Sequence, residues 1–429
     1  MTGEKDEVSD INNNLPHFEE IFSDRARKMK ASEIRELLKL TQKPEIISFA
    51  GGLPNPKAFP VDKIKEIMND LVKEEPDRIF QYGSTEGVPE LREEISKRLK
   101  RRWNIESDRD NILITVGSQE GLDLLGRLFI GSDSSVIMEA PTYLGALNAF
   151  NFYDPKIVSI PLDDNGMKMD LLEDYLDNKS KHGSTLKFLY TVPTFHNPAG
   201  VCMSLKRRKR LIDISHDHDL LIVEDDPYGE LRYTGEHLPP LKSLDKEDQV
   251  IYLGTFSKTL VPGFRIAWSL GSKQIINKMV IAKQAVNLCT PPFTQHIAKE
   301  YLRRGYIDDH LEKIINLYGR KQRLMLDSLE KYMPKEYIRW TKAEGGMFVW
   351  ATLSDGIDTT EMFQDAVSEK VAFVTGKSFF ADEAGNNTMR LNFTHPDDDK
   401  IVEGVQRLAR VIETWGKKGM GEEEVITGV

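Results

Sequence analysis

The sequence predicts an α/β fold: a mostly parallel central sheet with helices on both faces, and a smaller α+β domain formed by both chain ends. Two observations predict it. Short, almost continuously apolar runs alternate with helical segments through the middle of the chain, and beyond Leu311 the pattern changes to long helices around one strand-rich stretch, 345–392. The 429 residues are 40% hydrophobic and 29% charged, which is typical of a packed globular protein.

The elements can be placed in order along the chain. Residues 1–20 are polar and acidic, so we expect a disordered leader. Ala26 to Leu40 has apolar residues at helical spacing, which predicts an amphipathic helix before an irregular turn at Ser48 to Pro54. We assign the rest as an N-terminal segment with part of the small domain (21–60), a large domain (61–310), a C-terminal small domain (311–418) and a polar tail (419–429).

Five brief aliphatic or β-branched runs predict the buried strands of the central sheet. Ligands of such sheets collect at the carboxyl ends of the strands, so the residues that follow each run are the candidates for function. The runs are Asn111–Val116, Ser135–Glu139, Leu186–Val192, Leu220–Glu224 and Val250–Gly254.

Charge and cysteine content exclude several classes of protein. Lys and Arg total 58 against 68 Asp and Glu, so the net charge of −10 argues against nucleic acid as the main partner but leaves room for a local cationic pocket. Cys202 and Cys289 are too few for a disulfide framework, which favours a reducing, cytoplasmic location. No apolar run reaches membrane-spanning length. His216 and His218 form the only close histidine pair, and we expect a solvated helix end and no metal site there.

Polar residues follow the first three runs. Ser118 lies after the first run at the start of a helical pattern, where we predict that it is the N-cap and that the N–H groups beyond it form an anion site; an ordinary capped helix is the alternative. Tyr143 follows the second run and could stack on a planar ligand or be an ordinary core or rim tyrosine. Asn197 follows the third, either as a donor into the crevice or as a turn residue before Pro198.

The last two runs end in charged residues. Leu220–Glu224 leads into Asp225, and a carboxylate at the end of a buried strand costs free energy unless it meets a cation or a strong donor, such as a protonated pyridinium nitrogen. Val250–Gly254 leads into Thr255 to Arg265. There Lys258 could form a Schiff base, while two hydroxyls and an arginine could bind a phosphate dianion.

These motifs resemble the fold type I pyridoxal-phosphate enzymes, specifically the class I/II aminotransferases. The segment Thr255-Phe256-Ser257-Lys258-x-Leu260-x-Pro262-Gly263-x-Arg265 is similar to the lysine signature of the 2-aminoadipate, kynurenine and archaeal aromatic aminotransferases. The resemblance extends from about Ala31 to Phe393, and it implies pyridoxal 5′-phosphate as the cofactor.

The resemblance also implies a role for each cofactor-binding candidate. Lys258 would be the Schiff-base lysine and proton shuttle, and Asp225 the partner of the pyridine nitrogen. Asn197 and Tyr228 would bind the ring's phenolic oxygen, and Tyr143 would stack on the ring. The phosphate would be bound by Ser118, Gln119, Thr255, Ser257 and Arg265.

Four further residues would contact the substrate or the neighbouring subunit. Arg390 would bind the substrate α-carboxylate by a bidentate fork, and Gly52, of the Gly51-Gly52 pair, would leave room for the substrate. Arg35 corresponds to an arginine that some 2-aminoadipate enzymes use for the distal carboxylate; a solvated helix charge is the alternative. Tyr82 would reach the phosphate in the partner subunit, which implies a homodimer.

The function implied is transfer of an amino group from an L-amino acid to a 2-oxo acid in two ping-pong half-reactions. In the resembling subgroup the usual acceptor is 2-oxoglutarate, and the donors are 2-aminoadipate, aromatic amino acids, kynurenine or leucine. A pyridoxal-phosphate lyase and a leucine- or branched-chain-preferring aminotransferase are the alternatives.

Two further classes fit less well. A regulator that fuses this domain to a DNA-binding module would need a basic helix-turn-helix, and only about thirty residues precede the match. A nucleotide-binding loop is suggested by Gly376-Lys377-Ser378, but the glycine that it requires would fall at Val371.

Overall fold

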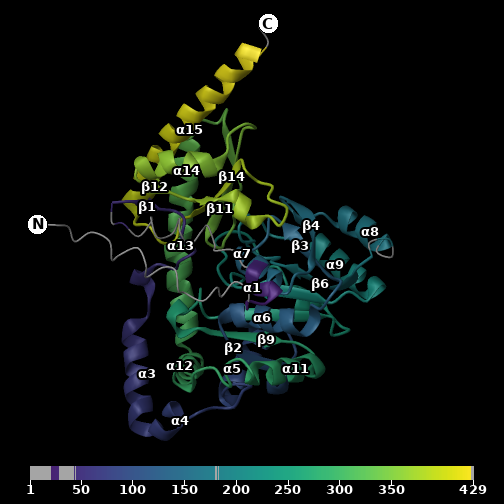
Figure 1. Cartoon of the computed structure of the whole chain (residues 1–429). Coiled ribbons are helices and arrows are strands. Elements are labelled where there is room, and N and C mark those ends of the chain that lie inside the picture. Colours follow the sequence, from purple (N-terminus) through teal and green to yellow (C-terminus); the bar gives the residue numbers. More distant parts are fainter. Residues whose placement is uncertain (1–20, 29–42, 44, 179–180, 182, 427–429) are drawn as a thin grey trace, which may run out of the picture.

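A computed structural model describes residues 21–28, 43, 45–178, 181 and 183–426 (Figure 1). The leader predicted for residues 1–20 lies outside these residues, as does most of the helix predicted for Ala26 to Leu40, of which only the first residues fall in α1. The helices are α1 Asp24–Lys28, α3 Val61–Glu74, α4 Pro76–Phe80, α5 Pro89–Trp103, α6 Gly117–Phe129, α7 Leu144–Asn151, α8 Met169–Asp177, α9 Leu205–His218, α10 Leu241–Leu244, α11 Lys273–Gln284, α12 Pro292–Arg303, α13 Tyr306–Tyr332, α14 Thr359–Ser368 and α15 Asp398–Ile426.

The strands of the described part of the chain form three sheets, of which the largest has eight strands in the order β2-β9-β8-β7-β6-β3-β4-β5. Its neighbouring strands β8, β7, β6, β3 and β4 are parallel, whereas β9 runs antiparallel to both of its neighbours. This confirms the mostly parallel sheet. The strands are β1 Ile47–Ser48, β2 Ile112–Val116, β3 Ser134–Ala140, β4 Lys156–Asp163, β5 Gly166–Met167, β6 Thr185–Thr191, β7 Ile222–Asp226, β8 Val250–Thr255, β9 Ile266–Leu270, β10 Ile338–Trp340, β11 Phe348–Leu353, β12 Val371–Ala372, β13 Val374–Thr375 and β14 Thr388–Asn392.

Alternating strand residues divide the large sheet into two apolar faces, and helices cover both. Leu113, Val223 and Leu253 face the helices α6, α7 and α11, whereas Ile222 and Val250 face α8 and α9. The helices α5 and α12 complete the second face beside β2 and β9. Because both faces are buried, successive residues of one strand point into different layers of the molecule.

A second, antiparallel sheet in the order β10-β11-β14-β13 packs with α14, α15 and the end of α13 around a separate apolar core. The N-terminal strand β1 pairs with β12, so residues from both ends of the chain meet here. Figure 1 shows α13 extending between the region of the large sheet and this second sheet, and its apolar residues belong to both cores. The domain boundaries given above stay a prediction, and α15 continues to Ile426, into the segment 419–429.

Two findings bear on membranes and metals. None of the helices in residues 21–28 and 45–426, as far as they are described, combines the length and the apolar character that a bilayer-spanning helix needs. Within the same residues there is no group of three or more His, Cys, Asp or Glu side chains arranged to hold a metal ion. His216 and His218 lie in the last turn of α9 and are partly exposed, which confirms the predicted helix end.

Candidate active site

The helix α6 begins immediately after β2 and presents its N-terminus at the carboxyl end of that strand. The prediction that Ser118 caps this helix is wrong, because the helix begins at Gly117. The Val116 N–H donates a hydrogen bond to Oε2 of Glu120 at 2.6 Å. Gly117 has φ of +69°, and a Cβ there would lie 2.1 Å from an Arg265 guanidinium nitrogen, so only glycine fits. Ser118 therefore lies in the first turn, where free N–H groups favour an anion.

Residues of the segment that follows β8 lie close to this helix N-terminus. The Arg265 backbone carbonyl accepts a hydrogen bond from the Gly117 N–H at 3.0 Å, and its guanidinium Nη1 lies 3.4 Å from the Ser257 hydroxyl. The Thr255 hydroxyl contacts Ser257 Oγ at 3.0 Å. The structure thus brings together four of the five predicted phosphate ligands. The fifth, Gln119, is exposed and donates to the Gly145 carbonyl.

Asp225 lies near the end of β7 and is almost completely buried. Its Oδ2 accepts a hydrogen bond from the Tyr190 hydroxyl at 2.9 Å, whereas its Oδ1 is buried without a hydrogen-bond partner among the described residues. Burial raises the pKa of Asp225 to about 7, against the hydrogen bond from Tyr190, which lowers it. A buried acceptor with one free oxygen is suited to a cationic N–H donor.

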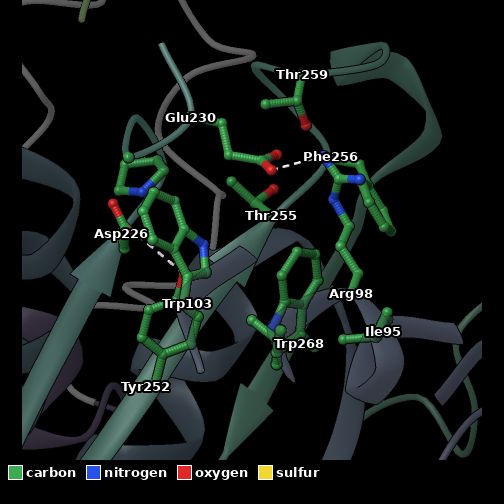
Figure 2. Close-up of a pocket in the computed structure, with 13 residues that line it drawn as sticks. Ile95, Arg98, Trp103, Asp226, Glu230, Tyr252, Thr255, Phe256, Thr259 and Trp268 are labelled. Carbon is green, nitrogen blue, oxygen red and sulfur yellow. Dashed lines mark hydrogen bonds and ion pairs between the residues drawn. The ribbon is translucent and has the colours of Figure 1, made fainter. Parts of the chain in front are cut away.

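The neighbouring Asp226 points into the other layer of the molecule. Its Oδ2 accepts a hydrogen bond from Tyr252, and Asp226 lines a small cavity of about 30 Å³ (Figure 2). Figure 2 shows this cavity among Arg98, Trp268 and Thr255, and Lys258 is not one of its lining residues. Alternation along β7 therefore separates the two aspartates, and only Asp225 lies on the face that carries Tyr190.

Lys258 is partly buried, and its Nζ donates a hydrogen bond to the Gly52 carbonyl at 2.9 Å. Burial lowers the pKa of Lys258 to about 8, and the positive charges of Arg390 and Arg265 lower it further in the same direction. An amine with this pKa is unprotonated in a much larger fraction near neutral pH than an ordinary lysine, and the unprotonated amine can act as a nucleophile or accept a proton.

Arg390, on β14, connects the second sheet to the candidate site. Its Nη1 donates to Asn197 Oδ1 at 2.8 Å, and its Nη2 donates to the Ala50 carbonyl at 3.0 Å. The guanidinium carbon lies 4.2 Å from the ring centre of Phe348 and 5.0 Å from that of Phe379. Burial lowers the pKa of Arg390 to about 10, so the side chain stays cationic at neutral pH.

The remaining candidates lie near Arg390 and Asp225. Asn197 Nδ2 donates to the Tyr228 hydroxyl at 3.3 Å, and both side chains are buried. A Cβ on Gly52 would lie 3.2 Å from the Phe348 ring and 4.0 Å from Arg390, so a side chain there would crowd the arginine. Burial raises the pKa of Tyr143, and the charge of Asp225 acts on it in the same direction, which places this ring within electrostatic range of the aspartate.

Besides Gln119, two predicted residues are not brought into the candidate site. Arg35 lies outside the described residues. The Tyr82 side chain is 79% exposed, at the surface between α4 and α5, and its role in a neighbouring active site stays a prediction.

Other contacts could not be found by inspecting the sequence. Tyr190 belongs to an apolar strand run and gave no separate signal; its contact with Asp225 depends on strand register. The carbonyls of Ala50 and Gly52 are backbone groups, for which sequence carries no signal beyond the irregular turn.

Comparison with known proteins agrees with this geometry. Residues 45–408 match the family model described as aminotransferase class I and II. The chain is 51% identical to an aromatic-amino-acid aminotransferase of Thermococcus litoralis, over 94% of this chain and 96% of that protein. A solved kynurenine aminotransferase of Pyrococcus horikoshii superposes with a TM-score of 0.90 at 50% identity, over 93% of this chain and 98% of that one. An alpha-aminoadipate aminotransferase of Thermus thermophilus superposes with a TM-score of 0.86 at 38% identity, over 93% and 98% of the two chains.

The Pyrococcus structure contains PMP, and the Thermus structure contains a phosphopyridoxyl adduct of leucine. The residues present here fit the same group. Asp225 offers a buried oxygen without a partner, Gly117 leaves space beside Arg265 at a helix N-terminus, and Lys258 offers an amine of lowered pKa. The cofactor is pyridoxal 5′-phosphate. The chain therefore belongs to the class I and II aminotransferase family, as a pyridoxal-phosphate-dependent aminotransferase of fold type I.

Proposed function

We propose that the protein transfers the amino group of an L-amino acid, of the 2-aminoadipate or aromatic and kynurenine type, to 2-oxoglutarate by a ping-pong mechanism. The observation that carries this proposal is the buried Arg390 guanidinium, hydrogen-bonded to Asn197 and within electrostatic range of Lys258. A cation at this place is suited to an α-carboxylate, which amino acids and 2-oxo acids share. The relatives named for aromatic, kynurenine and aminoadipate activity support the donor class.

In this proposal, the chain holds the cofactor through five sets of contacts. Lys258 holds its aldehyde carbon, Asp225 Oδ1 accepts from the ring nitrogen, and Tyr143 stacks on the ring. Asn197 and Tyr228 donate to the phenolic oxygen. The phosphate is bound by Ser118, Gln119, Thr255, Ser257 and Arg265.

When bound, pyridoxal phosphate supplies an electron sink that stabilises negative charge at the substrate Cα. The chain supplies orientation and proton transfer. Arg390 binds the α-carboxylate and so fixes the substrate relative to Lys258. The Lys258 amine accepts the proton from the substrate Cα and then donates it to the C4′ carbon of the cofactor. The lowered pKa of Lys258 favours both transfers. Asp225, as a buried carboxylate, keeps the ring nitrogen protonated.

We further propose a homodimer in which Tyr82 binds the cofactor phosphate in the partner subunit. The exposed aromatic side chains of Phe80 and Tyr82 support this, because 68% and 79% exposure, respectively, is costly for side chains that no partner covers. Sedimentation analysis should give a dimer, and Tyr82→Phe should weaken cofactor binding without changing the sedimentation coefficient. A monomer that retains full cofactor affinity would contradict this part of the proposal.

The two free cysteines, Cys202 and Cys289, support a reducing cytoplasmic location in this proposal.

A panel of amino donors with 2-oxoglutarate, scored by glutamate formation, tests the proposed substrates. We expect 2-aminoadipate, kynurenine or aromatic amino acids to give the highest kcat/KM. Leucine is a specific alternative donor because the Thermus structure contains a leucine adduct. A clear preference for leucine would shift the assignment to a branched-chain-preferring aminotransferase. Release of ammonia or of an eliminated group would identify a lyase instead.

A further inference from the structure

Two tyrosine–aspartate pairs lie next to each other in the large sheet with the same geometry. Tyr190 on β6 is in register with Val223, two residues before Asp225, and its hydroxyl donates to Asp225 Oδ2 at 2.9 Å. Tyr252 on β8 is in register with Glu224, two residues before Asp226, and donates to Asp226 Oδ2 at the same distance. Each tyrosine thus contacts the aspartate diagonally across the strand pair, on opposite faces of the sheet.

The Tyr190 phenol is rigidly held. Its side chain is completely buried, and its ring contacts the Phe150 ring of α7 edge to face at 5.8 Å between centres. Desolvation and the nearby charge of Asp225 raise the pKa of Tyr190 well above its usual range, so the phenol keeps its proton and acts as a donor. Among the described residues it is the one hydrogen-bond donor that contacts the Asp225 carboxylate.

This contact has two consequences for the aspartate. It fixes the carboxyl rotamer, because one oxygen is engaged by Tyr190 and the other is left free. It also opposes the burial that favours the neutral acid. A neutral Asp225 would have no negative charge to hold a proton on an adjacent ring nitrogen.

We propose that Tyr190 is a positioning residue that holds Asp225 in the orientation and anionic form needed to keep the cofactor's ring nitrogen protonated. This inference rests on the role of Asp225 in the proposed function. Tyr190 does not itself touch the reacting atoms in this proposal; it acts through the carboxylate.

The test uses the holoenzyme reconstituted with pyridoxal phosphate labelled with ¹⁵N in the ring, and compares Tyr190→Phe with Tyr252→Phe. The ¹⁵N chemical shift reports the protonation of the ring nitrogen, and titration of the cofactor-free protein gives the cofactor affinity. We expect Tyr190→Phe to shift the resonance toward that of Asp225→Asn and to weaken cofactor binding about tenfold, since a hydrogen bond to a charged group is lost. The control Tyr252→Phe removes an equivalent buried hydroxyl beside Asp226 and should leave the resonance at the wild-type position.

The inference is overturned if Tyr190→Phe keeps the wild-type resonance while Asp225→Asn moves it, because Asp225 then works without Tyr190. If Asp225→Asn also keeps the wild-type resonance, the assigned role of Asp225 fails and the inference fails with it. Circular dichroism checks that each variant folds. If Tyr190→Phe does not fold, Tyr190 can be replaced by 3,5-difluorotyrosine, which preserves the ring and makes the hydroxyl a stronger donor. The ¹⁵N chemical shift should then stay at the value of a protonated ring nitrogen, and the affinity for the cofactor should rise. A weaker cofactor affinity would contradict the inference.

Discussion

The substitution Asp225→Asn separates two effects of the buried carboxylate: it lowers the stability of the cofactor-free protein, and it strengthens cofactor binding. Asparagine has nearly the same shape, and its side-chain oxygen can still accept the hydrogen bond from Tyr190, but it carries no charge. In the cofactor-free protein the wild-type carboxylate is buried and one of its oxygens has no hydrogen-bond partner among the described residues, so its charge destabilises the folded state. We therefore expect Asn at this position to stabilise the cofactor-free protein and to weaken cofactor binding.

The magnitude follows from the pKa of Asp225, which burial raises from 3.8 to about 7 in the folded chain. This difference of roughly 3 units corresponds to about 4 kcal/mol, as an upper bound. Since the folded state holds the proton more tightly than the unfolded state, the stability contributed by the protonated carboxyl is fully present below about pH 4. It is lost as the pH rises to about 7. The Asn variant does not lose this stability, so its free energy of unfolding exceeds that of the wild type by an amount that grows between about pH 4 and pH 7.

Urea denaturation of both cofactor-free proteins at pH 4.5 and pH 8, at one protein concentration, measures this advantage. Glu224 and Asp226 are also buried with raised pKa values, but both proteins contain them, so their contribution cancels to first order. We expect a difference of up to about 4 kcal/mol in favour of Asn at pH 8 and little difference at the lower pH. An equal difference at both values would refute the reasoning.

Three further predictions concern the reaction. Lys258→Ala should abolish turnover while the protein still folds by circular dichroism, and normal turnover would contradict its assignment. Arg390→Lys should raise KM for amino donors about 10- to 100-fold because the planar fork is lost. The control Arg207→Lys changes a half-buried arginine that contacts Asp163 and the Gly166 carbonyl, and it should leave KM unchanged. Equal changes in both variants would exclude Arg390 as the carboxylate ligand. Arg35→Ala should lower kcat/KM for dicarboxylic donors more than for aromatic ones, and equal losses would remove it from the specificity site.

Five buried strands of the sheet could be predicted from the sequence because each is a short, almost continuously apolar run. All five appear within one or two residues of the expected bounds. The other three strands of this sheet, β4, β5 and β9, do not follow from the sequence pattern, and β5 has only two residues. β9 follows the lysine motif directly, so its residues Ile266–Leu270 were not separated from that segment, and β4 has an alternating rather than continuous apolar pattern.

The candidate site divides in the same way. Asp225 and Lys258 could be predicted because a charged residue at the end of a buried strand has few structural explanations. Tyr190 could not, since an aromatic residue in an apolar strand looks like core, and its role depends on the register of β6 against β7. The misplaced helix start at Ser118 has a similar cause: Glu120, three residues after Gly117, replaces the expected cap by reaching back to the Val116 N–H.

A single-turnover experiment without acceptor tests the central claim, aminotransferase activity, most directly. The purified protein loaded with pyridoxal phosphate is mixed with an excess of 2-aminoadipate or kynurenine. We predict that each subunit forms one equivalent of 2-oxo acid and then stops, with the cofactor in its aminated form, until 2-oxoglutarate restores it. Continued product formation with release of ammonia, in the absence of any 2-oxo acid acceptor, would contradict the claim.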